Sequence, residues 1–228
     1  MEVQAEIWLF VTNFDDEFPK ATFDKLLSDL PENLHEKILS YKKWRDYQAS
    51  LLGNLLLKKG LERANLDVNL LQEIKYQAKD RPFFDLKSLN INYSIDFNIS
   101  HSGKYVLCAI AKNGAVGVDI EKHREIEFSV FDRYFSTDEW HDMIHANNPL
   151  KRFFYYWSLK ESVIKADGRG SILLQKSERK NESLIQCDGK NWWYQELNVD
   201  EDYSAFVCFD KNVDECFIHR LESIKFLP

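Results

Sequence analysis

Hydrophobic residues recur with two different periods along the chain, and together these periods predict a mixture of helices and strands. From about Phe23 to Ala64, apolar residues return every three or four positions, as on one face of amphipathic helices. A second helical segment is predicted from the capping sequence Ser136-Thr137-Asp138-Glu139 to about His145. A third is predicted from Pro149 to about Ala166, with Gly168 ending it.

Short apolar runs bounded by turn residues predict β-strands. The candidates are residues 7–11, 72–77, 97–100, 105–111, 116–121, 183–186, 192–197, 204–209 and 216–220. The last four have the pattern of antiparallel strands. Turns are predicted at Lys79-Asp80-Arg81-Pro82, at Ser100-His101-Ser102-Gly103 and at Lys112-Asn113-Gly114. The third turn has the residues of a hairpin, so strand 116–121 would return beside strand 105–111.

Helices followed by strands occur twice along the chain, which predicts an α+β fold. The turn at residues 112–114 is the predicted boundary between an N-terminal half, residues 1–112, and a C-terminal half, residues 113–228. The sequence contains no residue-level repeat, low-complexity segment or linker.

The composition predicts a folded protein with no broad affinity for nucleic acid. Of the 228 residues, 44% are hydrophobic, so a packed core is expected. The net charge of −7 argues against the extended basic face that nucleic acid requires, although it leaves room for a local basic pocket.

The cysteines and the N-terminal residues bear on the compartment. The four cysteines show no CxxC spacing, and we interpret them as buried thiols in a reducing environment. The first residues lack a basic segment followed by an apolar run, and no apolar stretch approaches the roughly 20 residues of a membrane span. We therefore expect a soluble, cytoplasmic protein that does not bind membranes.

Two acidic motifs about forty residues apart carry the candidate chemistry. Asp119 and Glu121 alternate with Ile120 in a predicted strand, so both carboxylates project from the same face. Glu161 and Lys165 are four residues apart on one face of a predicted helix. Three carboxylates without a histidine are suited to magnesium or manganese, which prefer oxygen ligands and leave positions open for phosphate.

Each motif alone is ordinary, because an acid and a lysine four residues apart usually form a surface pair. Two other classes use similar residues. In a metal-dependent nuclease the acid and the lysine lie two apart on a strand, whereas here they lie four apart on a helix. A carrier-protein-binding module with a decayed site would lack a metal ligand, and none of the three acids is missing.

The two motifs in combination resemble the phosphopantetheinyl transferase superfamily, specifically the surfactin-synthetase-activating type. The matches are Gly117-Val118-Asp119-Ile120-Glu121 and Trp157-Ser158-Leu159-Lys160-Glu161-Ser162-Val163-Ile164-Lys165. A third match is Asn98-Ile99-Ser100-His101-Ser102-Gly103, and a fourth, altered one is Asp80-Arg81-Pro82. The resemblance covers essentially the whole chain.

The resemblance implies a monomer of two similar α+β halves related by a pseudo-twofold axis, with coenzyme A in the cleft between them. It implies transfer of the phosphopantetheine arm of coenzyme A to a serine of an apo acyl or peptidyl carrier protein. The by-product would be adenosine 3′,5′-bisphosphate. Fatty-acid, polyketide and nonribosomal-peptide carriers all remain open as substrates.

The resemblance also assigns roles to the acidic residues. Asp119, Glu121 and Glu161 would hold Mg²⁺ against the pyrophosphate of coenzyme A. Glu161, directly or through a metal-bound water, would take the proton of the carrier serine. Lys165 would donate to a phosphate oxygen. Lys160 is left as either a phosphate contact or a solvated lysine.

The resemblance implies that residues of both halves of the chain bind coenzyme A, with Lys165 coming from the C-terminal half. Ser100 and His101 match positions that contact phosphate, the histidine as a cation. Arg81 takes the place of a lysine near the adenine end, and Lys37 matches a basic position that reaches the 3′-phosphate. Glu139 falls where the family often has a further acid, but its place at a helix N-terminus explains it, and we do not count it as a ligand.

Overall fold

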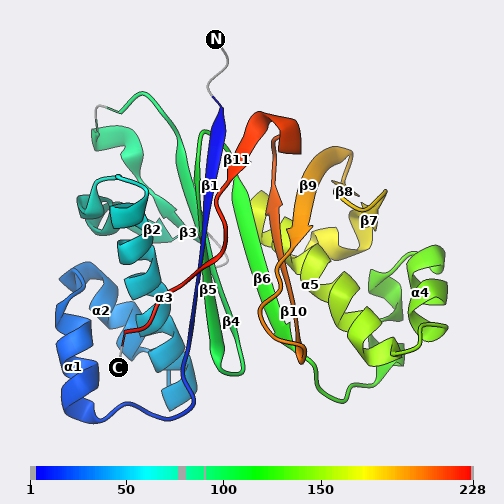
Figure 1. Ribbon diagram of the computed structural model, residues 1–228, viewed down its shortest axis with the longest axis horizontal. Coiled ribbons are helices and arrows are strands. Elements are labelled where there is room, and N and C mark those ends of the chain that lie inside the picture. Colours follow the sequence, from blue (N-terminus) through cyan, green and yellow to red (C-terminus); the bar gives the residue numbers. More distant parts are fainter. Residues whose placement is uncertain (1–3, 77–80, 90, 227–228) are drawn as a thin grey trace.

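Two β-sheets meet along one edge of each, and helices cover their outer faces (Figure 1). The computed structural model describes residues 4–76, 81–89 and 91–226. The apolar faces of the two sheets pack on each other through a buried cluster that includes Leu9, Leu107, Val118 and Val207. The resulting arrangement is a mixed α+β fold, as the sequence predicts.

The first sheet has the strand order β11-β1-β5-β4. Its strands are β1 (Ala5–Asn13), β4 (Ile95–Ser102), β5 (Tyr105–Lys112) and β11 (Cys216–Ile218), with β12 (Glu222–Ser223) also paired to β1. The helical region predicted as one stretch is three helices, α1 (Lys20–Ser28), α2 (Glu32–Leu39) and α3 (Trp44–Arg63). They pack on the sheet face that carries Phe10, Phe97 and Ile110.

The second sheet has the order β6-β10-β9-β8-β7. Its strands are β6 (Val116–Lys122), β7 (Ser177–Arg179), β8 (Leu184–Cys187), β9 (Lys190–Glu196) and β10 (Tyr203–Phe209). Helix α5 (Pro149–Asp167) covers its outer face, and α4 (Thr137–Ile144) lies beside α5. The predicted capping box is confirmed at Ser136 and Glu139, and Gly168 ends α5 in the left-handed conformation with φ 80°.

The predicted hairpin at residues 112–114 is wrong. Strand β5 pairs with β1 and β4, whereas β6 pairs with β10 in the other sheet. Asn113 has the positive φ of 63° expected in a turn. The chain therefore crosses from the first sheet to the second between β5 and β6. Just after this turn, the Ala115 N–H donates to Asp210, which follows β10, at 2.8 Å.

Two other local expectations need correction. The turn predicted at Ser100-His101-Ser102-Gly103 begins later, because β4 continues to Ser102 and only Gly103 and Lys104 separate it from β5. The strand predicted at 216–220 is not antiparallel within the second sheet. As β11, it pairs in parallel with β1 of the first sheet.

A small hairpin of β2 (Ile74–Tyr76) and β3 (Pro82–Phe84) stands beside the first sheet. Gln77, Lys79 and Asp80, which the sequence places in a strand end and a turn, lie outside the described residues. Short 3₁₀ helices occupy Val68–Glu73, Leu86–Ser88, Phe128–Val130, Asp132–Tyr134, Ser171–Lys176 and Val213–Glu215.

The four cysteines are free. Cys108, Cys187 and Cys208 are buried, as expected, whereas Cys216 is only partly buried because it lies in the short strand β11 at the edge of the first sheet. Within the described residues, none of the helices combines the length and the hydropathy needed to cross a bilayer. The division of the chain at residue 112 stays a prediction.

Candidate active site

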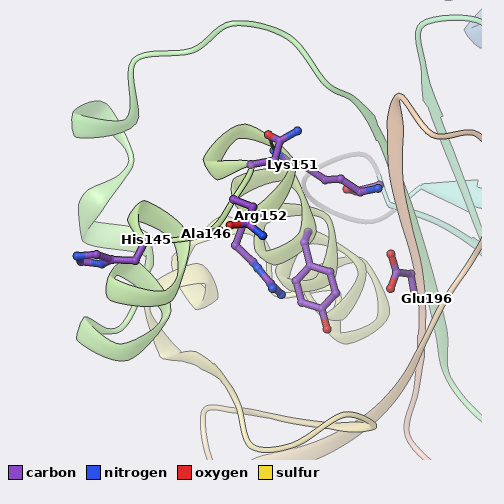
Figure 2. Close-up of a pocket in the computed structure, with 9 residues that line it drawn as sticks. His145, Ala146, Lys151, Arg152 and Glu196 are labelled. Carbon is purple, nitrogen blue, oxygen red and sulfur yellow. Dashed lines mark hydrogen bonds between the residues drawn. The ribbon is translucent and has the colours of Figure 1, made fainter.

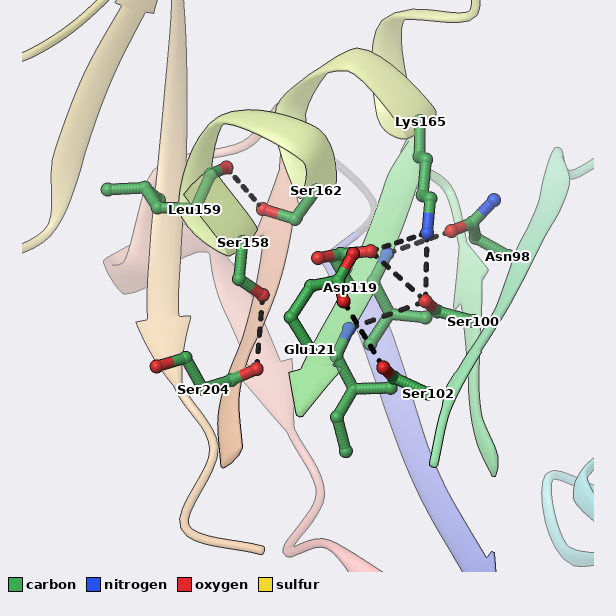
Figure 3. Close-up of polar contacts among 12 residues, drawn as sticks. Asn98, Ser100, Ser102, Asp119, Glu121, Ser158, Leu159, Ser162, Lys165 and Ser204 are labelled. Carbon is green, nitrogen blue, oxygen red and sulfur yellow. Dashed lines mark hydrogen bonds and ion pairs between the residues drawn. The ribbon is translucent and has the colours of Figure 1, made fainter. Parts of the chain in front are cut away.

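The two sheets are joined at their edges by a side-chain ladder between β4 and β6 (Figure 3). Alternate side chains of β4 accept hydrogen bonds from alternate backbone N–H groups of β6. The pairs are Asp96 with Val116 (3.0 Å), Asn98 with Val118 (3.0 Å), Ser100 with Ile120 (3.3 Å) and Ser102 with Lys122 (3.0 Å). Since every pair is separated by 20 residues in sequence, the two strands run in the same direction.

Asp119 lies in the middle of β6 and is buried, with 3% of its surface exposed. Its Oδ1 atom accepts hydrogen bonds from Ser100 Oγ at 3.1 Å and Lys165 Nζ at 2.5 Å. Lys165 Nζ also donates to Ser100 Oγ at 2.8 Å. The other oxygen, Oδ2, is buried and has no hydrogen-bond partner among the described residues. A buried carboxylate oxygen of this kind is costly unless a further group binds it.

Glu121 lies two residues further along the same face of β6. Its Oε2 atom accepts hydrogen bonds from Ser102 Oγ at 3.2 Å and Arg124 Nη1 at 3.2 Å. Burial, and then the charge of Asp119, raise the pKa of Glu121, while Arg124 and Ser102 lower it.

Glu161, on helix α5, lies close enough to Asp119 and Glu121 to interact with both of their charges. Burial, followed by the charge of Asp119, raises the pKa of Glu161 to about 7, against the opposing effect of Lys165. The helix lies directly on β6 at Gly117, where a Cβ atom would be 2.1 Å from the carbonyl oxygen of Ser162. The absence of a side chain at Gly117 therefore lets the two motifs approach each other.

These three acids fit a divalent cation by their chemistry. They supply hard carboxylate oxygens, their charges repel one another, and one buried oxygen of Asp119 has no partner in the part of the chain that the structure describes. Among the residues that the structure describes, no group of three His, Cys, Asp or Glu side chains is already arranged as a metal site. The fit rests on the chemistry of the three carboxylates, whose oxygens suit Mg²⁺ or Mn²⁺.

Lys160 fills neither of the two roles that the sequence left open. It is 1% exposed and forms an ion pair with Glu139 at 2.8 Å, and it also donates to the carbonyl of Ser177. Glu139 accepts a hydrogen bond from the backbone of Ser136 at 2.9 Å within the capping box. Lys160 therefore joins α5 to α4 and β7.

Four of the five residues expected to bind coenzyme A line two neighbouring depressions, whereas Ser100 is buried and is not among the lining residues of either. One, of about 520 Å³, is lined by Arg81, Glu161 and Lys165 among others. The second, of about 230 Å³, is lined by Lys37 and His101 among others. Pro82 and Ile99 line both depressions, which makes them adjoining parts of one trough.

Arg81 already has protein partners. Its Nη2 atom contacts both carboxylate oxygens of Asp96, at 2.9 and 3.1 Å, and its Nε donates to the carbonyl of Lys165 at 2.8 Å. Burial raises the pKa of Asp96 even though the Arg81 guanidinium opposes this shift. Arg81 thus connects β3, the first rung of the ladder and the end of α5, a role that the sequence did not predict.

His101 and Lys37 lie at the other end of the trough. Desolvation, and then the Lys165 ammonium, lower the pKa of His101 below its usual value, against the opposing charges of Asp46 and Asp119. This shift disfavours the cationic histidine that the sequence predicts. Lys37 Nζ lies 5.8 Å and 5.5 Å from the ring centres of Tyr41 and Tyr76.

A separate depression of about 550 Å³ lies at the start of α5, and Figure 2 shows its lining. His145, Lys151, Arg152 and Glu196 contribute to it. Arg152 is partnered by Asp142 at 3.4 Å. None of the predicted site residues lines this depression, so the candidate chemistry is confined to the trough and the sheet junction.

The sequence missed Asp96, Asn98 and Ser102 as parts of the site. Their signal is a run of polar residues at every second position of β4, opposite apolar residues that face the helices. The predicted turn over residues 100–103 concealed this alternation.

Comparison with protein families gives two matches that together cover most of the chain. Residues 18–113 match the N-terminal 4′-phosphopantetheinyl transferase family, and residues 115–209 match the 4′-phosphopantetheinyl transferase superfamily. The chain belongs to the 4′-phosphopantetheinyl transferase superfamily.

Curated relatives are similar over much of the chain. The 4′-phosphopantetheinyl transferase gsp of Aneurinibacillus migulanus is 34% identical over 163 residues, which cover 69% of this chain and 64% of that protein. The 4′-phosphopantetheinyl transferase Sfp of Bacillus subtilis strain 168 is 30% identical over 156 residues, 66% of this chain and 65% of that protein. A 4′-phosphopantetheinyl transferase of Bacillus subtilis is 26% identical over 200 residues, 81% of this chain and 84% of that protein. The chain thus aligns with slightly less than two thirds of the first two relatives.

Proposed function

We propose that the protein transfers the 4′-phosphopantetheine arm of coenzyme A to a serine of an apo carrier protein in a magnesium-dependent reaction. Adenosine 3′,5′-bisphosphate is the other product. The observation that carries the proposal is the grouping of Asp119, Glu121, Glu161 and Lys165 where the two sheets meet. The family of the chain and the names of its relatives support the same reaction.

Asp119, Glu121 and Glu161 hold the cation in this proposal. A divalent cation at these carboxylates supplies positive charge against the pyrophosphate and its leaving group. Two observations support this placement, because a bound cation would relieve both. Asp119 Oδ2 lacks a hydrogen-bond partner among the described residues, and the pKa values of Glu121 and Glu161 are raised.

Glu161 is the proposed general base. Of the three acids, Glu161 is the one that lines the trough proposed for coenzyme A, so its carboxylate is the best placed to reach the attacking serine. Its carboxylate would take the proton from the carrier serine as the serine oxygen attacks the β-phosphorus of coenzyme A. Lys165, which forms an ion pair with Asp119, would donate to a phosphate oxygen.

Coenzyme A occupies the trough in this proposal. Lys37, Arg81, Ser100 and His101 are the binding residues, together with Lys165. The adjoining depressions that contain Lys37 and His101 on one side and Arg81 and Lys165 on the other support this path. A phosphate beside His101 would raise the pKa of its ring again and recruit it as a cation.

The remaining parts of the proposal concern the whole protein. It is a monomer of two similar halves, residues 1–112 and 113–228, related by a pseudo-twofold axis, with the trough as the cleft between them. It works in the cytoplasm, which the four free cysteines support, since thiols of this kind suit a reducing compartment.

The test is incubation with coenzyme A, Mg²⁺ and apo carrier proteins of the fatty-acid, polyketide and nonribosomal-peptide types. Intact-mass spectrometry of each carrier should show the addition of one phosphopantetheine group, and chelation of Mg²⁺ with EDTA should abolish it. A binding module would retain the carrier without changing its mass, and a nuclease would cleave DNA in the same buffer. An unchanged mass for every carrier at millimolar Mg²⁺ would overturn the proposal.

A further inference from the structure

Two serines of β4 make the same double contact with β6 (Figure 3). Ser100 Oγ accepts the Ile120 N–H at 3.3 Å and donates to Asp119 Oδ1 at 3.1 Å. Ser102 Oγ accepts the Lys122 N–H at 3.0 Å and donates to Glu121 Oε2 at 3.2 Å. In each case one hydroxyl holds the backbone of β6 and the carboxylate of the residue just before it.

This double contact fixes a direction. A hydroxyl has a single proton to donate, and accepting a backbone N–H restricts its position. The proton of Ser102 is therefore directed at Glu121. The hydrogen bond from the Lys122 N–H holds the Ser102 hydroxyl at the edge of β6. The position from which Ser102 donates to Glu121 is therefore fixed by the backbones of β4 and β6.

The other partner of Glu121 is a weaker constraint. Arg124 contacts the same oxygen at 3.2 Å, but its side chain is 61% exposed. Exposed ion pairs of this kind contribute little, because solvent screens them and the long side chain loses conformational freedom. Ser102 is thus the more rigid of the two contacts that orient Glu121.

We propose that Ser102 is a positioning residue that holds the Glu121 carboxylate in the orientation in which it binds the divalent cation. This inference rests on the proposed function, since it takes Glu121 as a metal ligand. Ser102 differs from Ser100 in this respect: Ser100 also contacts Lys165 at 2.8 Å and belongs to the proposed coenzyme A site, whereas Ser102 acts through Glu121 alone.

The experiment measures Mn²⁺ binding to the complex of the protein with coenzyme A, without carrier, by electron paramagnetic resonance. Ser102→Ala should weaken Mn²⁺ binding about tenfold, the lower range for loss of a residue that orients a metal ligand. Ser102→Thr keeps the hydroxyl and should bind Mn²⁺ like the native protein. Coenzyme A affinity measured in EDTA should be the same in all three proteins.

Ser204→Ala is the matched control. Ser204 is buried and lies opposite Glu121 on the other neighbour of β6, but its hydroxyl contacts His123 at 3.0 Å. This variant loses the same group from the same region without touching a carboxylate, so its Mn²⁺ affinity should stay native. Equal losses in Ser102→Ala and Ser204→Ala would show general loosening and overturn the proposal.

Glu121→Gln separates this inference from the proposed function. If Glu121→Gln loses Mn²⁺ binding while Ser102→Ala retains it, the metal site stands and the role of Ser102 is refuted. If Glu121→Gln binds Mn²⁺ like the native protein, Glu121 is not a ligand, and both the metal assignment and the role of Ser102 fail.

Discussion

The three acids of the site are unequal, and their surroundings explain the difference. Asp119 is paired with Lys165 at 2.5 Å and accepts a hydrogen bond from Ser100 at 3.1 Å. Glu161 is buried beside two other acids, which raises its pKa to about 7. The surroundings thus distinguish Asp119, which an ammonium and a hydroxyl contact directly, from Glu161, whose burial beside other acids raises its pKa.

Glu161→Gln tests the role of Glu161 as the base. Glutamine keeps the shape of the side chain but loses the basicity and the negative charge. We expect kcat to fall by at least about 100-fold, since general base catalysis alone contributes roughly 10²–10⁴-fold. Coenzyme A affinity, measured by calorimetry, should change much less. Collapse of that affinity with kcat preserved at saturation would make Glu161 a binding residue and require another base.

At the contact between α5 and β6, Gly117→Ala should disturb both stability and rate. The new Cβ would meet the Ser162 carbonyl oxygen at 2.1 Å and the Ala166 nitrogen at 2.4 Å, and both are backbone atoms that cannot turn aside. We expect about 1–3 kcal/mol of destabilisation, the usual cost of overpacking. The displaced helix carries Glu161 and Lys165, so kcat should fall as well.

The control for this prediction is Gly114→Ala. There the nearest atom to the new Cβ is an oxygen of the Asp210 side chain at 3.1 Å, which can move by a small rotation. Chemical denaturation and steady-state kinetics of the two variants should therefore differ clearly. Native kinetics in Gly117→Ala would mean that α5 can shift without moving the catalytic groups.

Arg81 connects three elements, and this predicts that its loss has two separable effects. Arg81→Ala leaves the Asp96 carboxylate without its charge partner at a site where both side chains are less than one fifth exposed. We expect about 3 kcal/mol of destabilisation from this unpaired charge. Adding Asp96→Asn should restore most of the stability, because the amide oxygen can still accept the Val116 N–H.

The same pair of variants tests whether Arg81 also binds coenzyme A. If it does, the double variant regains stability in urea denaturation while its KM for coenzyme A stays raised. Recovery of both quantities in the double variant would limit Arg81 to its structural role.

The elements themselves were largely predictable where their ends are marked chemically. Pro149 begins α5 and Gly168 ends it, and the capping box at Ser136 marks the start of α4. The partners of the strands were not predictable in the same way. Strand β5 is buried on both faces, so its apolar pattern carries no information about which strand lies beside it.

Part of the candidate site was also predictable. The period of two in β6 predicts that Asp119 and Glu121 share a face, and the spacing of four in α5 predicts the same for Glu161 and Lys165. In the structure these faces meet, with Asp119 paired to Lys165. The ladder was not predictable, because Ser and Asn side chains favour turns in isolated segments and only the neighbouring edge of β6 makes them rungs. The burial of Lys160 was hidden for a related reason, since its partner Glu139 lies on another helix.

In the molecule as a whole, the chain returns to the first sheet after completing the second. The C-terminal segment passes from β10 to β1, where β11 and β12 pair with it in parallel (Figure 1). The Ile224 N–H donates to the Val11 carbonyl at 2.8 Å, and Ile224 and Phe226 pack against the core under α1–α3. The ladder beside the site and this segment thus both connect the two sheets.

These two connections should have different consequences when broken. A chain ending at Arg220 lacks β12, Ile224 and Phe226 but keeps every residue of the trough and the ladder. We expect it to lose about 3 kcal/mol of stability from the two partly buried side chains, seen as a lower Tm. Its kcat and its affinity for coenzyme A should stay near native at 20 °C. Ile224→Asp, which damages the same packing by one substitution, should lower the Tm in the same direction. A truncated chain with an unchanged Tm and a lost activity would instead show that this segment governs the catalytic residues across the sheet, and that the ladder alone does not hold them.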